Sequence, residues 1–181
     1  MVPEKVRRHL ESYWARARSS FESGDVPIAA FLAITLIEEV GKVVLLGNAE
    51  LAGELDRRAF RNHEAKYAHA AYSTLLVNSR VSRIYGGLES RFAKWFRNGA
   101  LFGIRNSALY LEIVNDGLVI PSEAVSRNDA FLLVCIAGEV LAEIQGKYTG
   151  SGPEEWSEVL KQVDQFRSVF GHDSGLTNHC T

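Results

Sequence analysis

The chain contains only two cysteines among its 181 residues, Cys135 and Cys180. Two cysteines are too few for the disulfide framework of a small secreted domain or for a cysteine-rich zinc site. Cys135 lies in an apolar helical stretch and Cys180 is the penultimate residue, so we expect two free thiols in a reducing compartment. The N-terminal stretch is charged from residue 4 and lacks the apolar segment of a signal peptide, which indicates a cytoplasmic protein.

Long hydrophobic runs are also absent. Residues 28–37 form a largely apolar run that ends at Glu38. A membrane-spanning helix needs roughly 20 apolar residues, about twice as many. We therefore expect no association with a membrane.

The common motifs of metal and nucleotide sites are missing as well. The Glu-x-x-His repeat of di-iron bundles occurs nowhere, and His63-Glu64 is not followed by the second histidine of a zinc protease. There is no P-loop, dinucleotide fingerprint or nucleophile elbow. The sequence thus predicts neither a metal nor a cofactor.

Apolar residues at helical spacing are abundant. They make up 46% of the sequence, which is enough for a core in a chain of this length. They recur every three to four positions between proline, serine, aspartate and glycine residues of the kind that begin and end helices. The helices predicted in this way span residues 3–23, 25–48, 56–80, 88–99, 100–112, 126–148 and 153–170.

Residues 112–125 break this spacing. Strand-like residues flank the turn signal Asp116-Gly117, which predicts a small hairpin or an extended loop. The fold class is therefore all-α, a helical bundle with this one exception. We expect residues 1–170 to form a single domain and residues 171–181 to form a flexible tail.

Three charged residues, Glu38, Glu39 and Lys42, interrupt the otherwise apolar helix predicted over residues 25–48. Ionised side chains are rarely buried unless they are paired. On a helix Lys42 reaches back to either carboxylate, three or four residues earlier. This charged face turns either to solvent or a cleft, or toward partners from another segment.

His63 and Lys66 are candidate partners, because they lie three residues apart on the helix predicted over residues 56–80. If that helix packs beside residues 25–48, a carboxylate meets His63 or Lys66 across the interface. One interpretation is a buried ion-pair network that fixes the helix register. The other is a polar network that supports a reactive His63.

The net charge of −2 hides a strong asymmetry along the chain. Residues 56–105 carry ten basic and three acidic groups, whereas residues 106–181 carry four basic and eleven acidic groups. The basic segment suits a nucleic acid or another anionic partner. Alternatively, the two segments neutralise each other in the fold. The exposed cations expected in this segment are Arg57, Arg58, Arg61, Arg80, Arg83, Arg91, Lys94 and Arg97.

A further cluster, Arg105, Asn106 and Tyr110, falls within two turns of the helix predicted over residues 100–112. The guanidinium and amide groups are suited to hold a phosphate, and the phenol can donate a hydrogen bond. The alternative is an arginine paired with an acid beside a half-buried tyrosine.

Three motifs in this order resemble the AbiV-type abortive-infection proteins, which belong to the HEPN superfamily. The first is E-E-x-x-K within the apolar helix, the second is F-x-x-H-x-x-K ending at Lys66, and the third is L-Y-x5-D-G ending at Gly117. The resemblance covers about residues 25–145. It implies a HEPN bundle, usually dimeric, whose catalytic members cut RNA without a metal.

The mark of those catalytic members is an arginine, often followed by asparagine, with a histidine four to six residues after the arginine. Arg105-Asn106 matches the first half, but Tyr110 stands where the histidine is expected. A second pair with the required spacing is Arg58 and His63.

We therefore expect a phage-defence HEPN homodimer that acts on RNA or translation as a metal-independent endoribonuclease. In this hypothesis His63 is the base for the 2′-hydroxyl, and Arg57, Arg58 and Arg61 attract RNA. Arg105, Asn106 and Tyr110 would hold the phosphate and donate to the leaving oxygen. The alternative is a non-enzymatic protein of the same fold that binds a phage or host protein, and Tyr110 in place of histidine favours it.

Overall fold

The computed structural model describes residues 3–71, 80–85, 89–97, 99–115, 117–148 and 153–171. These residues are almost entirely helical, which confirms the predicted all-α fold. None of the helices in these ranges has the length and hydropathy needed to cross a membrane. The elements are α1 (Glu4–Glu22), α2 (Val26–Ala52), α3 (Arg57–Arg61), α4 (His63–Ala71), α5 (Arg80–Tyr85), α6 (Glu89–Arg97), α7 (Ala100–Ser107), β1 (Glu112–Val114), β2 (Gly117–Val119), α8 (Pro121–Ala124), α9 (Arg127–Tyr148) and α10 (Pro153–Phe170).

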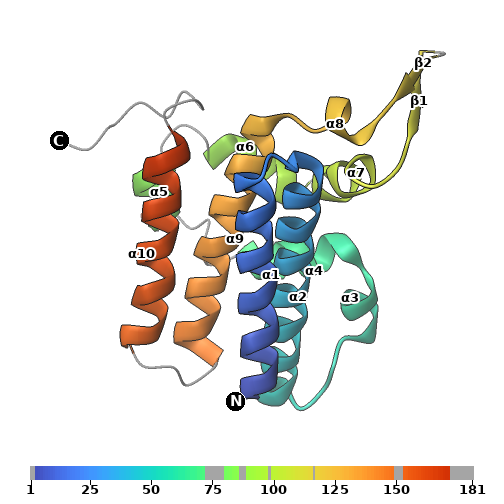
Figure 1. Ribbon diagram of the computed structural model, residues 1–181. Helices are drawn as coiled ribbons and strands as arrows, with labels where there is room; N and C mark the ends of the chain where they lie inside the picture. The colour runs from blue at the N-terminus through green and yellow to red at the C-terminus, as the bar shows by residue number, and fades with distance from the viewer. Residues whose placement is uncertain are drawn as a thin grey trace.

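The four long helices α1, α2, α9 and α10 run alongside one another and form the body of the bundle (Figure 1). Every residue of α9 from 130 to 142 is buried, because α1, α2 and α10 all pack against it. Trp14 of α1 donates its indole N–H to the carbonyl oxygen of Val134 at 3.1 Å. The core therefore lies around α9, and α2 faces both this core and the shorter helices α3, α4 and α7.

Helix α2 is longer than predicted. It begins after Asp25, with Pro27 in its first turn, as the sequence indicates. The predicted end at Gly47-Asn48 is wrong: the helix continues to Ala52 and ends at Gly53, which has a φ of +76°. An interior glycine costs only about 1 kcal/mol relative to alanine, and the packing of buried residues such as Leu45 offsets that cost.

The single helix predicted over residues 56–80 is instead two helices, α3 and α4. Asn62 has extended backbone angles (φ −92°, ψ 122°) and separates them. Its side-chain oxygen accepts the backbone N–H of Ala65 at 3.1 Å, so Asn62 caps the N-terminus of α4. This capping bond competes with a continuous helix and makes His63 the first residue of α4. Residues 72–79 of the predicted helix lie outside the described ranges.

Helix α7 is shorter than the predicted 100–112, because it ends at Ser107. Tyr110 lies beyond this end, although its backbone N–H still donates to the carbonyl of Asn106 at 2.9 Å. The side chain of Ser107 donates to Glu112 Oε1 at 2.7 Å and connects the end of α7 to the strand that follows. Helix α6 forms as predicted and buries Phe92 and its neighbours on one face.

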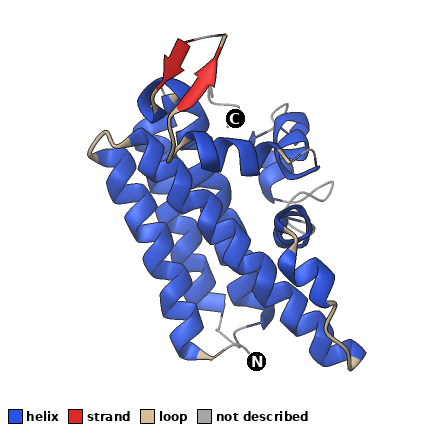
Figure 2. Cartoon of the chain, turned by 90° about the vertical axis from the view of Figure 1, so that its right-hand side faces the viewer, coloured by secondary structure: helices blue, strands red, loops and turns tan. Residues whose placement is uncertain are grey.

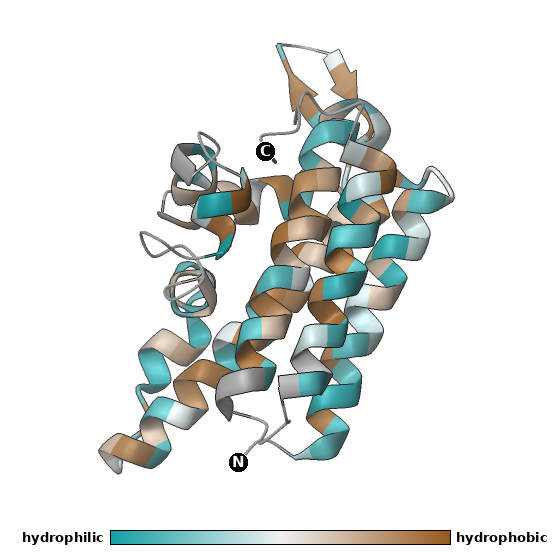
Figure 3. Cartoon of the chain, turned by 90° about the vertical axis from the view of Figure 1, so that its left-hand side faces the viewer, coloured by the Kyte–Doolittle hydropathy of each residue, from teal (hydrophilic) through white to brown (hydrophobic). Residues whose placement is uncertain are grey.

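The predicted hairpin is confirmed. Strands β1 and β2 pair antiparallel, with Val114 opposite Gly117 and Ile113 opposite Leu118. The turn therefore lies one residue earlier than the sequence predicts, and Asn115 adopts a positive φ of 48°, as a tight hairpin turn requires. The hairpin projects beyond the ends of the helices (Figures 2 and 3).

The two C-terminal helices begin and end as predicted. Ser126 caps α9 by accepting the backbone N–H of Asp129 at 3.0 Å, and α10 runs from Pro153 to Phe170. Cys135 is a buried free thiol within α9. The predicted flexible tail and Cys180 fall almost entirely outside the described ranges.

The backbones of helices α2 and α4 lie close together at Gly41. A Cβ at this position would overlap the carbonyl oxygen of Lys66 and would lie 2.9 Å from its Cα. The neighbour is the backbone of α4, which cannot rotate away as a side chain can. The absence of a side chain at residue 41 therefore sets how near α4 lies to α2.

We predict that Gly41→Ala lowers the free energy of unfolding by about 1–3 kcal/mol or more, because the added methyl group forces the two helices apart. The matched control is Gly103→Ala in α7, where an added Cβ meets nothing within 4 Å and the helical propensity of alanine is expected to be neutral or stabilising. Urea denaturation followed by circular dichroism measures both. Equal stability of the two variants would contradict the close approach.

Candidate functional site

The candidate site is built around the buried carboxylate of Glu38 on α2. One oxygen, Oε1, accepts a hydrogen bond from Lys66 Nζ at 2.7 Å. The other, Oε2, lies 2.9 Å from Nδ1 of His63. Lys66 is buried like Glu38, whereas the side chain of His63 is 39% exposed. The structure therefore brings both sequence candidates of the α4 segment onto one carboxylate.

Two local features of the chain produce this arrangement. The cap at Asn62 starts α4 at His63, so that Lys66 follows one turn later on the same helix face. Gly41 lies one turn after Glu38 on α2 and admits the backbone of α4 at Lys66. Side chains at both positions of α4 can therefore reach the same point on α2.

Lys42 and Glu39 form the outer part of the cluster. Lys42 Nζ donates to Glu39 Oε1 at 2.6 Å and lies 4.0 Å from Glu38 Oε1. Both side chains are more than a quarter exposed. When His63 is neutral, the cluster holds two carboxylates, Glu38 and Glu39, and two ammonium groups, Lys42 and Lys66. Its charges therefore cancel.

The ionisation of Glu38 fixes the tautomer of His63. Burial by itself raises the pKa of Glu38, but the hydrogen bonds from Lys66 and His63 outweigh it and place that pKa below the ordinary 4.5. At neutral pH the carboxylate is therefore ionised and can only accept hydrogen bonds. Nδ1 of His63 must then carry the hydrogen, which leaves the lone pair on Nε2 of the neutral ring.

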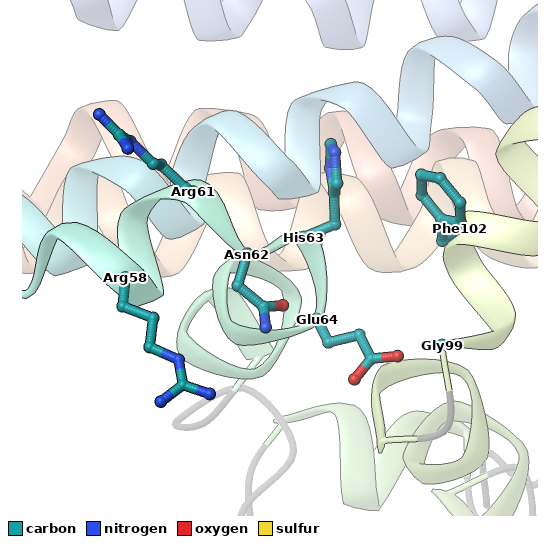
Figure 4. A pocket seen from close by; sticks show the side chains of 7 residues that line it. All are labelled: Arg58, Arg61, Asn62, His63, Glu64, Gly99 and Phe102. Atoms are coloured by element: carbon teal, nitrogen blue, oxygen red, sulfur yellow. The ribbon is translucent and has the colours of Figure 1, made fainter.

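His63 also lines an open pocket of about 560 Å³ at the junction of α3 and α4. The ring of Phe102 on α7 lies beside His63, with their centroids 5.1 Å apart. Figure 4 shows the side chains of Arg61, His63 and Phe102 extending to the same side of the ribbon. The residues that line the pocket are Arg58, Arg61, Asn62, His63, Glu64, Gly99 and Phe102.

The three arginines of α3 are exposed, and none forms an ion pair within the described ranges. Arg58 and Arg61 line the pocket, whereas Arg57 does not. Cations without acidic partners remain available to an anionic ligand. The start of the basic segment therefore carries exposed positive charge, as the sequence indicates.

The rest of the basic segment differs from the expectation of exposed cations. Arg80 Nε donates to the buried carboxylate of Glu139 at 3.0 Å, and its Nη2 lies 2.5 Å from Asp164 Oδ1. Arg91 pairs with Asp129. The acidic C-terminal third thus neutralises these two arginines, which corrects the expectation that they are free cations and agrees with the alternative of mutual neutralisation. Arg83 and Lys94 are exposed, and the side chain of Arg97 lies outside the described part of the chain.

The third group of candidates, Arg105, Asn106 and Tyr110, lies apart from the pocket lining. The guanidinium carbon of Arg105 is 5.4 Å from the centroid of the Phe31 ring on α2. Tyr110 is 62% exposed beyond the end of α7. No hydrogen bond or ion pair between described residues joins Arg105 or Tyr110 to His63.

Tyr67 and Phe102 belong to the site, but sequence reasoning did not assign them to it. The hydroxyl of Tyr67 is buried and has no hydrogen-bond partner among the described residues. Burial, and then the charge of Glu38, raise the pKa of Tyr67 above the ordinary 10.0, while the charge of Arg105 acts in the opposite direction. Tyr67 therefore lies within reach of both charges. An aromatic residue in an apolar helix gives no sequence signal for such a place.

The comparison with family models decides the family. The HEPN-type family model described as AbiV matches residues 2–142, well over half of the chain. The chain belongs to the AbiV family. This is a family of HEPN-type abortive-infection proteins, and the match extends from the start of α1 into α9. All the candidate residues of the AbiV protein described above fall within it. No curated protein and no solved structure matches the chain.

Within the described ranges, no three histidine, cysteine, aspartate or glutamate side chains are arranged to hold a metal ion. The groups that the pocket offers to a ligand are guanidinium, imidazole, amide, carboxylate and an aromatic ring. These groups suit an anionic, partly aromatic ligand such as a nucleotide.

We predict that Glu38→Met costs about 3–5 kcal/mol, because it leaves the Lys66 ammonium buried without a carboxylate. The double variant Glu38→Met, Lys66→Met removes both charges and is expected to be more stable than either single variant. Glu39→Met is the control, since its partly exposed pair with Lys42 is worth at most about 1 kcal/mol. Chemical denaturation of wild type, Glu38→Met, Lys66→Met and the double variant gives the coupling energy. Additive single effects would show that Glu38 and Lys66 do not interact.

The pH dependence of stability follows from the lowered pKa of Glu38. A carboxyl group whose pKa falls on folding stabilises the native state above its unfolded pKa, near 4.5, and loses this contribution as pH falls through the folded value. The stability difference between wild type and Glu38→Gln should therefore shrink below pH 4.5. Urea titrations at a series of pH values measure it. A difference that is constant down to the acid transition would contradict the lowered pKa.

Proposed function

We propose that this protein binds RNA at the α3–α4 pocket and cleaves it without a metal, with His63 as the proton acceptor. The observation that carries the proposal is the hydrogen bond between His63 Nδ1 and the buried Glu38, which orients the imidazole and, in the neutral ring, puts the lone pair on Nε2 beside exposed arginines. A general base needs both a free lone pair and a fixed orientation. The half-exposed ring meets the further need for access to substrate.

The proposed reaction is an internal transesterification. Nε2 of His63 takes the proton of a ribose 2′-hydroxyl, and the 2′-oxygen attacks the adjacent phosphorus. The bond from phosphorus to the 5′-oxygen breaks, and that oxygen leaves with a proton from a donor or from water. The products are a 2′,3′-cyclic phosphate and a 5′-hydroxyl. Glu38 stabilises the imidazolium that forms, as a carboxylate does behind a histidine base.

Arg58 and Arg61 supply the positive charge that such a step requires. The attacked phosphate gains negative charge in the transition state, and fixed guanidinium groups stabilise that charge. Both arginines line the pocket together with His63. Arg57, exposed on the same short helix, extends the attraction to neighbouring phosphates.

Phe102 offers a place for a base of the RNA. Its ring is 39% exposed and lies against His63 at the edge of the pocket. Nucleobases of single strands stack on aromatic side chains whatever their sequence. Arg105, Asn106 and Tyr110 lie on or just beyond the same helix, and in this proposal they contact the RNA outside the pocket.

The non-enzymatic alternative rests on a different observation. Tyr110 occupies the place where catalytic HEPN members have histidine, and it is exposed and does not line the pocket. In this alternative the charged cluster fixes the contact of α2 with α4, and the surface binds a phage or host protein. It predicts that changes at His63 leave function intact.

Cleavage of a labelled single-stranded RNA tests the proposal. We expect His63→Ala to lower the cleavage rate by about 100-fold or more, as loss of a general base does. Arg61→Ala should weaken RNA binding and reduce its salt dependence, because one phosphate contact is lost. Wild-type product should carry a 2′,3′-cyclic phosphate end.

The charge-matched control is Arg16→Ala, which removes an exposed arginine of α1 that does not line the pocket. Its cleavage rate and RNA affinity should equal those of wild type. Equal cleavage by wild type and His63→Ala would remove His63 as the base. RNA binding without any cleavage would leave the protein as an RNA-binding, non-enzymatic member of its family.

A further inference from the structure

The pocket beside His63 contains a carboxylate that the proposed cleavage does not use. Glu64 is the one acidic residue among the described residues that line it, next to Arg58 and Arg61. Its side chain forms no hydrogen bond or ion pair with another residue of the described chain. A negative charge at a site for RNA repels phosphates, so this carboxylate is unfavourable there unless the ligand brings hydrogen-bond donors to it.

The fold holds the carboxylate of Glu64 against the start of α7. Gly99, the N-cap of that helix, has a φ of +66°, and a Cβ there would lie 2.6 Å from Glu64 Oε1. Figure 4 shows the side chain of Glu64 directed toward Gly99. Phe102 follows three residues later, and its backbone N–H donates to the carbonyl of Gly99 at 3.0 Å. The carboxylate therefore lies at the beginning of the helical turn that carries the Phe102 ring.

Helix electrostatics accounts for a negative charge at Glu64 but not for a pocket around it. An acidic residue in the first turn of α4 interacts favourably with the helix dipole, and so does one beside the start of α7. Neither effect requires the carboxylate to border a space of about 560 Å³ that it shares with an aromatic ring and two arginines. A role toward a ligand in that space explains both the charge and its surroundings.

The other groups of the pocket determine where each part of a nucleotide lies. In the proposed reaction the phosphate lies at Arg58 and Arg61, and the 2′-hydroxyl lies at Nε2 of His63. The centroid of the Phe102 ring is 5.1 Å from that of the His63 ring. A base is attached to the ribose carbon next to the one that carries the 2′-hydroxyl. The base that stacks on Phe102 is therefore that of the nucleotide on the 5′ side of the bond that breaks.

The edge of that base meets a group that only accepts hydrogen bonds. An ionised carboxyl group has two acceptor oxygens side by side and no donor. Guanine offers two adjacent donors, its N1–H and its 2-amino group, and these match the two oxygens. Adenine, cytosine and uracil each place a ring nitrogen lone pair or a carbonyl oxygen beside their donor, and a carboxylate repels these acceptors. In a single strand this edge of the base is free to be recognised.

We propose that Glu64 selects guanine in this pocket, so that the protein cuts RNA on the 3′ side of guanosine. This rests on the proposed function, because it uses the same pocket, and adds the base that the pocket prefers. Both carboxylate oxygens accept hydrogen bonds from the base while the base stacks on Phe102. Glu64 takes no part in proton transfer; it determines which nucleotide places its 2′-hydroxyl at His63. The 5′ product of each cut then ends in guanosine 2′,3′-cyclic phosphate.

Four oligonucleotides of otherwise identical sequence test the proposal. Each carries one ribonucleotide, with guanine, adenine, cytosine or uracil, in a labelled deoxyribonucleotide strand without other guanines, so that only the bond after the ribonucleotide can be cut. Wild type should cut the guanine strand at least about tenfold faster than the other three, which is the discrimination expected of one two-bond contact to a base. Inosine lacks the 2-amino group, and its strand should be cut at an intermediate rate.

Variants separate base recognition from charge and from stacking. Glu64→Gln keeps the size of the side chain but turns one acceptor into a donor, so it should lower the guanine rate about tenfold relative to the adenine rate. Phe102→Leu should lower all four rates alike, because stacking does not depend on the base. The matched control is Glu54→Gln, which removes an exposed glutamate just before α3 that does not line the pocket. It should keep the wild-type preference.

The same strands with 2′-deoxyribose throughout cannot be cut, and fluorescence anisotropy measures their binding alone. A guanine preference in binding that Glu64→Gln abolishes, without cleavage of any strand, supports base selection and removes the endoribonuclease. Equal cleavage of all four strands by wild type supports the endoribonuclease and overturns base selection. Strands that are neither cut nor bound overturn both.

Two results with Glu64→Gln also overturn base selection. If this variant retains the guanine preference, another group recognises the base. If it lowers all four rates equally, Glu64 acts through the stability of the helices, which circular dichroism and urea denaturation of the same protein measure.

Discussion

The approach of α4 to α2 at Gly41 is the contact on which the candidate site depends. A residue without a side chain lets the backbone of Lys66 lie directly against α2. Only at that separation do side chains from the first turn of α4 reach a carboxylate one turn away on α2. The hydrogen bonds of Glu38, the orientation of His63 and the position of the pocket beside it all follow from this one contact. A packing constraint in the backbone thus determines the electrostatics of the site.

The two interpretations of the charged cluster apply to different members of it. Lys66 is buried, and its ammonium group is satisfied by Glu38, so it belongs to the structural ion pair that holds α4. His63 takes the second oxygen of the same carboxylate but remains 39% exposed, so it belongs to the surface that a ligand can reach. The contact with Lys66 keeps Glu38 ionised, and the ionised carboxylate orients the ring of His63. Any chemistry at His63 therefore depends on the structural ion pair between Glu38 and Lys66.

The sequence was informative where one physical effect dominates and uninformative where two compete. The apolar spacing predicted the helices of the core, and the charged residues of α2 predicted that partners come from another segment. The break at Asn62 was missed because a capping bond competes there with good helix formers on both sides. The true end of α2 was missed because packing overrides the cost of Gly47. The pairing of Arg80 with Glu139 and Asp164 joins residues far apart in the chain, which no local pattern encodes.

The unbroken burial of α9 has a consequence for motion within the bundle. Thirteen consecutive residues shielded on every side can exchange their amide hydrogens only when the whole domain opens. Helix α3, in contrast, has five residues and none that is buried, so its amides exchange through small local openings. The arginines of the candidate site are therefore carried by a short helix without buried residues, while His63 and Lys66 are held to α2 by the buried carboxylate of Glu38. Ligand capture can reorganise α3 without disturbing the carboxylate that orients the histidine.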